Sequence, residues 1–253
     1  MHSSLYAIFV PALLPVIFVL VYVYKKDKVE KEPFGFVLKV LIWGAILSIP
    51  CAGLEQVAEM ILGAFFEAGT VNYAAAENIL GVALIEELSK YLVLMIFVWR
   101  NKNFDYRYDG IVYAVSASLG FAALENVLYI ISFGTEISIG RALFAIPGHA
   151  TFGVFMGYYL SRAKDAKLNG QLVKSKFCRL MALLSATIIH GIYDFLLDDV
   201  VQENYFFVFY IFVIILDVRA IMVIRHEFKT DRPLGPENII RYEDAESGYD
   251  EDE

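Results

Sequence analysis

Seven long apolar runs divide the chain, and each is close to the roughly 20 residues that a helix needs to cross a bilayer. The runs cover residues 4–24, 34–50, 75–99, 110–133, 140–161, 178–197 and 204–224. Polar and charged clusters separate them. The pattern predicts an all-α fold: a polytopic membrane helix bundle of about seven transmembrane helices.

The segment from 51 to 66 has apolar residues at helical spacing on one side and Glu55 and Glu59 on the other. It is therefore either an extension of the second span or a helix that lies in the membrane interface. Pro50 makes a break before it plausible.

Composition supports the membrane interpretation. Hydrophobic residues make up 58% of the 253 residues, whereas soluble domains reach about 45–50%. The first apolar run lacks a basic start and a small-residue cleavage site, so we expect a spanning helix there and not a cleaved signal peptide. Cys51 and Cys178 fit neither a disulfide framework nor a metal motif.

The net charge of −8 comes largely from the end of the chain. Seven of the last eleven residues are Asp or Glu, a composition typical of disorder. We therefore expect a membrane domain over 1–226 and an acidic, disordered tail over 227–253. Since no basic patch is present, nucleic acid is excluded as a partner, and the lipid bilayer is the expected surrounding.

Lys and Arg gather on alternate connections between the predicted spans. Eighteen flank one set of connections and the end of the last span, whereas Arg141 alone flanks the other set. Cytoplasmic loops carry the excess of Lys and Arg. We therefore expect a multi-pass protein of the cell membrane with its N-terminus outside and its C-terminus in the cytoplasm.

Four predicted spans carry polar residues that are costly inside a bilayer. A charged side chain near the centre costs at least about 2.5–3.5 kcal/mol. The candidate site residues are Glu86, Glu87 and Lys90 in the third span, Glu125 and Asn126 in the fourth, His149 in the fifth, and His190 and Asp194 in the sixth.

The predicted spans bring these residues to a common depth. Glu86 lies about ten residues from the outer end of its span, His149 about nine, and Glu125 and His190 about eight. At 1.5 Å per residue, all four lie roughly 12–15 Å beneath the outer surface. We expect a single site in this layer, with Glu55 outside it.

The charges in the layer demand compensation. Four carboxylates face one lysine, so the cluster must hold protons, carry a charged histidine or bind a cation. The Glu87–Lys90 ion pair and the Glu125–Asn126 pair also have a purely structural interpretation as contacts between helices. His190 and Asp194 are four residues apart on one helix face, a spacing at which a carboxylate can orient an imidazole.

The ordered motifs resemble those of the PrsW family, which are bacterial and archaeal intramembrane proteases distantly related to the CAAX prenyl endopeptidases. The matching motifs, within residues 75–200, are Glu86-Glu87-x-x-Lys90, Phe121-x-x-x-Glu125, His149 and His190-x-x-x-Asp194. The resemblance implies hydrolysis of a membrane-anchored protein, such as an anti-sigma factor, on its extracytoplasmic side. Glu86 and Glu87 would then be the activating carboxylates, and the other motif residues would complete the site.

Two chemical routes stay open for such an enzyme. His149, His190 and Glu125 could hold Zn²⁺ with an open position for water. Alternatively, Glu86 would act as base on a water while imidazoles stabilise the oxyanion. The sequence contains no His-Glu-x-x-His motif. A different function, a proton- or ion-coupled transporter or channel, would also use buried Glu, His and Asp.

Overall fold

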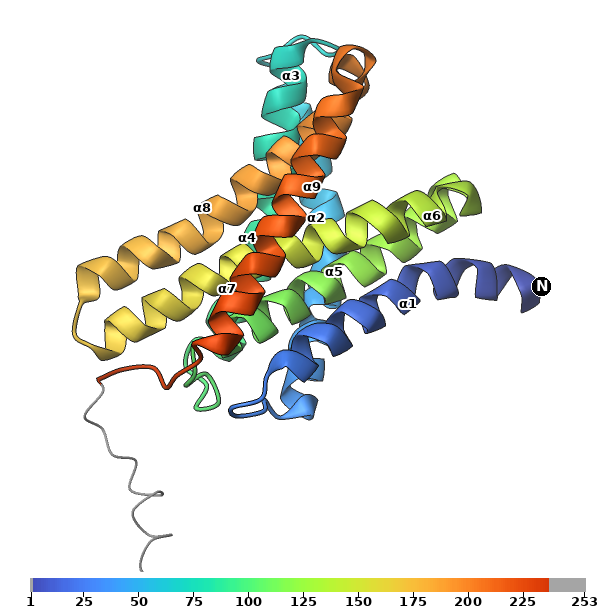
Figure 1. Cartoon of the computed structure of the whole chain (residues 1–253). Helices are drawn as coiled ribbons and strands as arrows, with labels where there is room; N and C mark the ends of the chain where they lie inside the picture. Colours follow the sequence, from blue (N-terminus) through green and yellow to red (C-terminus); the bar gives the residue numbers. More distant parts are fainter. Residues whose placement is uncertain (1, 237–253) are drawn as a thin grey trace, which may run out of the picture.

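The computed structural model describes residues 2–236 and consists, over that range, of helices and their connections, without strands (Figure 1). The all-α prediction is therefore confirmed. The single helices are α1 (His2–Lys26), α2 (Phe34–Leu62), α5 (Asp109–Phe133), α8 (Leu172–Leu197) and α9 (Asp199–Lys229). Two further helical segments each combine several elements.

The first composite segment covers 71–98 and includes two π-helical stretches. Its elements are α3 (Val71–Ala76), η1 (Glu77–Ala83), α4 (Leu84–Val93) and η2 (Leu94–Val98). The second covers 135–168 and consists of η3 (Thr135–Ile137), α6 (Ser138–Gly140), η4 (Arg141–Ala145) and α7 (Ile146–Leu168). π-helical turns are rare and occur frequently at functional sites. Both composite segments contribute residues to the layer predicted from the sequence.

Five helices of the described chain are long and apolar enough to cross a membrane. They are Ile8–Lys26 within α1, α2, α5, α8 and Tyr205–Lys229 within α9. The composite segments, which coincide with the predicted third and fifth spans, are not among these five. These apolar helices identify the chain as a multi-pass membrane protein.

Helix α2 settles the two interpretations of the segment after Pro50. The helix continues through this proline to Leu62, so 51–62 extends the second span. A proline inside a membrane helix is tolerated because neighbouring groups can satisfy the freed carbonyl. The interfacial-helix alternative is therefore wrong for these residues.

Helix α5 is the centre of the bundle. In its most apolar 18-residue window 72% of the residues are buried, compared with 17% for α1. Helices α2 and α7 pack against it, and Figure 1 shows α7 running beside it. Small residues permit this close approach, because a Cβ atom at Gly120 would overlap the Leu41 backbone of α2. The motif residues on α5 are thereby held between the helices that carry the others.

The described residues after α9 turn back onto the bundle. Leu234 N donates to Asp105 O at 2.6 Å, and Gly235 N donates to the Asp165 carboxylate at 3.0 Å. The acidic tail was expected from residue 227, but 227–229 complete α9 and 230–236 make these contacts. The rest of the expected tail, 237–253, lies outside the described residues.

Candidate active site

The first turns of α4 place three of the predicted residues around one ammonium group. Lys90 Nζ lies 3.0 Å from Glu86 Oε2 and 2.7 Å from Glu87 Oε1. The spacings of four and three residues put both carboxylates on the face of the helix that Lys90 occupies. All three residues are buried, with 4% or less of their surface exposed. The lysine therefore neutralises part of a charge that the bilayer would otherwise disfavour.

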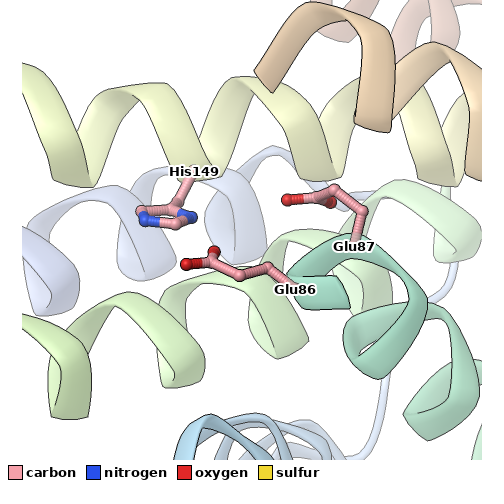
Figure 2. Close-up of side chains that lie close together, drawn as sticks. All are labelled: Glu86, Glu87 and His149. Atoms are coloured by element: carbon pink, nitrogen blue, oxygen red, sulfur yellow. The ribbon is translucent and has the colours of Figure 1, made fainter. Parts of the chain in front are cut away.

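His149 comes from the first turn of α7 and joins this group to α5. Its Nδ1 lies 3.0 Å from Lys90 Nζ, and its Nε2 lies 2.9 Å from Glu125 Oε2. Figure 2 shows the imidazole beside the side chains of Glu86 and Glu87. The two nitrogens of one ring thus connect the α4 cluster with the carboxylate on α5.

His190 on α8 lies between two carboxylates. Its Nδ1 is 3.0 Å from Glu87 Oε1, and its Nε2 is 3.0 Å from Asp194 Oδ2. The ring of Phe152 stacks on His190 with centroids 4.5 Å apart, which fixes the plane of the imidazole. The centroids of the two histidine rings are 5.3 Å apart. Four helices therefore converge as the depth argument predicts.

Arg141 is a site residue that the sequence analysis did not identify. It lies on η4, eight residues before His149, and its Nη2 is 3.1 Å from Glu125 Oε1. Its Nε donates to Asn126 Oδ1 at 2.6 Å, so this arginine links Asn126 to the site. One feature of the sequence could have identified it: among the connections predicted to lie outside, Arg141 is the single Lys or Arg.

A cavity of about 630 Å³ gives access to part of the cluster. Its polar wall includes Glu86, Glu125, His149, His190 and Asp194. Glu87 and Lys90 are not part of this wall and are at most 1% exposed. The cavity thus separates groups that a bound molecule can touch from groups that hold them in place.

Glu55 does not lie outside the layer, contrary to the sequence-based expectation. It lines the same cavity, and also a neighbouring cavity of about 520 Å³ whose wall includes Glu86 and Glu125. The reason is that α2 continues past Pro50, which places Glu55 beside α4 and α5. The two cavities therefore meet at the carboxylates.

The local charge remains negative even with Arg141 included. Glu86, Glu87, Glu125 and Asp194 face the cations Lys90 and Arg141, which leaves two negative charges if both histidines are neutral. Protons on the cluster or a divalent cation would neutralise them. Buried arrangements of this kind are typical of acid–base and metal chemistry.

Several known proteins resemble this chain in sequence. The family described as "PrsW family intramembrane metalloprotease" matches residues 32–218. A protease PrsW of Geobacillus kaustophilus is 40% identical over 183 residues, covering 72% of this chain and 76% of that protein. The protease PrsW of Bacillus subtilis is 36% identical over 205 residues, covering 80% and 88%.

A third relative extends the match over most of the chain. The protease PrsW of Halalkalibacterium halodurans is 31% identical over 228 residues, which are 90% of this chain and 100% of that protein. No solved structure matches significantly. The motifs, their convergence and these matches lead to one conclusion: the chain belongs to the PrsW family of intramembrane proteases.

Proposed function

We propose that this protein is an endopeptidase that hydrolyses a peptide bond of a membrane-anchored protein, with Glu86, His149 and His190 acting on substrate and water. The observation that carries the proposal is that these three side chains, from three different helices, line one cavity. Peptide hydrolysis needs a base for water, a stabiliser of the oxyanion and a proton donor for the leaving amine.

Glu86 is the proposed general base. It lines the cavity, whereas its neighbour Glu87 does not. Lys90 holds one oxygen of Glu86 at 3.0 Å, and His190 Nδ1 lies 3.9 Å from the same oxygen. The carboxylate is therefore fixed at the cavity wall, where it can take a proton from a water molecule. Glu87 is proposed to position Lys90 and His190.

The partners of the two histidines assign them different protonation patterns. His149 Nδ1 faces an ammonium, so it accepts, and Nε2–H donates to Glu125. Both nitrogens of His190 face carboxylates, so each of them donates when those carboxylates are ionised. In this scheme His190 is the imidazolium that stabilises the oxyanion and later gives a proton to the leaving amine.

A zinc ion is a second candidate at this cluster. Donor atoms of Glu86, Glu87 and His149 lie within 4.8 Å of one another, but the Lys90 ammonium lies within 3.0 Å of all three side chains, so a zinc ion there would take the place of that ammonium. A zinc ion held by these three side chains would supply an activated water. This set differs from the predicted His149, His190 and Glu125, because Glu125 contacts the opposite nitrogen of His149 from the one that faces Lys90.

We further propose seven spans, with the composite segments as the third and fifth, and a cut near the extracytoplasmic side. Two contacts support the proposal that lysines lie together at one end of the helix bundle. Lys26 Nζ lies 5.2 Å from the Phe228 ring, and Lys164 Nζ donates to Trp99 O at 2.7 Å. The first brings the end of α1 to that of α9, and the second brings the end of α7 to that of η2. The proposed substrate is a single-pass membrane protein such as an anti-sigma factor.

Cleavage of such substrates by the purified full-length protein in liposomes tests the proposal. We expect Glu86→Gln and His190→Gln to lower the rate by about 10²–10⁴-fold, the usual contribution of general acid–base groups. Asp194→Asn should cost less, about 10–100-fold, if Asp194 only orients His190. Glu67→Gln, in the exposed connection after α2, is the matched control and should leave the rate unchanged. Near-wild-type cleavage by the first two variants would mean that the cluster only holds the helices together and has no catalytic role.

A further inference from the structure

A second group of acidic residues, three of them buried, lies far from the candidate active site. Asp27, Glu30 and Glu32 belong to the connection between α1 and α2, and Asp109 begins α5. Asp109 and Glu125 are 16 positions apart on α5, a separation of about 24 Å along the axis. Asp27, Glu32 and Asp109 are each at most 1% exposed, which is rare for acids without a partner charge.

Three of these carboxylates approach one another closely. Glu30, Glu32 and Asp109 each place one oxygen within 4.8 Å of an oxygen of the other two. This acidic cluster, Glu30–Glu32–Asp109, joins two segments that are distant in sequence. Like charges at such distances repel strongly in a buried site unless a positive charge lies between them.

Hydrogen bonds of the surrounding chain hold one oxygen of each buried carboxylate. The Tyr113 hydroxyl donates to Glu32 Oε2, and the backbone N–H groups of Asp105 and Tyr106 donate to Asp109 Oδ2. The orientation of both carboxylates is therefore fixed by groups outside the cluster.

The second oxygens of these two residues have no such donors. Glu32 Oε1 and Asp109 Oδ1 are buried and receive no hydrogen bond from an N–H or hydroxyl group of residues 2–236. A buried acceptor without a donor costs about 1–3 kcal/mol, and more when it is charged. These two oxygens therefore need a positive group beside them, either a shared proton or a cation.

We propose that Glu30, Glu32 and Asp109 bind a hard divalent cation of the Mg²⁺ or Ca²⁺ class, a metal site separate from the candidate active site. Carboxylate oxygens are the ligands these ions prefer, and water would complete the coordination. The ion would link the α1–α2 connection to the start of α5, the central helix. Neither the donors nor the position depends on the proteolytic function.

Terbium luminescence tests the site directly, because Tb³⁺ takes the oxygen ligands of Ca²⁺ and is sensitised by a tyrosine as close as Tyr113. We expect the full-length protein in detergent to give a saturable signal that Ca²⁺ or Mg²⁺ displaces. Glu32→Gln and Asp109→Asn should weaken the binding at least about tenfold, as should the less buried Glu30→Gln. Glu67→Gln is the control. Equal signals from all variants would overturn the proposal.

Thermal unfolding in Ca²⁺, Mg²⁺ or chelator provides the second measurement. A ligand that binds only the folded state raises the melting temperature. We expect a rise of several degrees with a divalent ion, and little or none in Asp109→Asn, whose amide oxygen still accepts from Asp105 and Tyr106. If acidification from about pH 8 to 6 stabilises the protein while divalent ions do nothing, the carboxylates share a proton and the metal site is wrong.

Discussion

Lys90 is the residue on which the polar cluster depends most. Its ammonium contacts Glu86, Glu87 and His149 and lies 4.3 Å from the ring centroid of Phe121. We expect Lys90→Met to destabilise the protein by about 3–5 kcal/mol, because it leaves two buried carboxylates without their cation. Thermal unfolding in detergent measures the loss.

The matched control for this change is Lys176→Met, which removes an exposed lysine near the start of α8. That variant should unfold close to the wild-type temperature. A Lys90→Met protein as stable as the control would mean that the carboxylates hold protons and do not need the lysine. The cleavage mechanism would then have to start from a protonated cluster.

Single site residues could be predicted from the sequence where a charged side chain lies in an apolar helix, because its burial in the bilayer is costly. Charged side chains in apolar helices identify Glu86, Glu125 and His190, and equal depth on four helices predicts that they meet. Arg141 could not be assigned in this way, because a lone arginine near a predicted helix end has an ordinary interfacial interpretation. Only the packing of η4 against α5 brings it to Glu125.

At the scale of elements, the contact between α2 and α5 positions the wall of both cavities. Gly120 approaches the Leu41 backbone so closely that an added Cβ would overlap it. We expect Gly120→Ala to cost about 1–3 kcal/mol through overpacking, even though alanine favours helices. The unfolding temperature should fall, and cleavage should fall with it if Glu125 moves.

Gly35→Ala serves as the control, since a Cβ there meets nothing within 4 Å. It should be neutral or slightly stabilising, because alanine restricts the unfolded chain. A Gly120→Ala protein that behaves like Gly35→Ala would show that α2 can shift away from α5 without loss. The position of Glu55 at the cavity would then be adjustable too.

The ends of helices and their π-helical stretches could not be predicted from the periodicity of apolar residues. The pattern leaves open whether the second span continues past Pro50. In the structure α2 continues to Leu62, because a proline removes one hydrogen bond but packing against α5 and η1 holds the helix. The π-helical stretches η1 and η4 were likewise invisible to a pattern analysis. Each shifts the register of the helix just before Glu86 or His149.

At the scale of the whole molecule, orientation decides which side of the membrane the cavity faces. The Lys and Arg distribution predicts that the N-terminus lies outside, and the structure gathers Lys26, Lys164 and Arg107 near the ends of helices that share one side. The connection that includes Glu67 belongs to the other side, near α3 and the start of α9 (Figure 1).

We expect alkaline phosphatase to be active when fused after Glu67 and inactive when fused after Pro236, because the enzyme folds only outside the cytoplasm. A cytoplasmic reporter such as green fluorescent protein should give the reverse pattern. Fusion at Pro236 keeps α9 and the contacts of Leu234 and Gly235 intact, so a loss of folding does not confuse the result. Phosphatase activity at Pro236 would mean that the protein has the opposite orientation in the membrane. The depth of Glu86 and His190 would then be measured from the cytoplasmic face, and a substrate would have to be cut on that side.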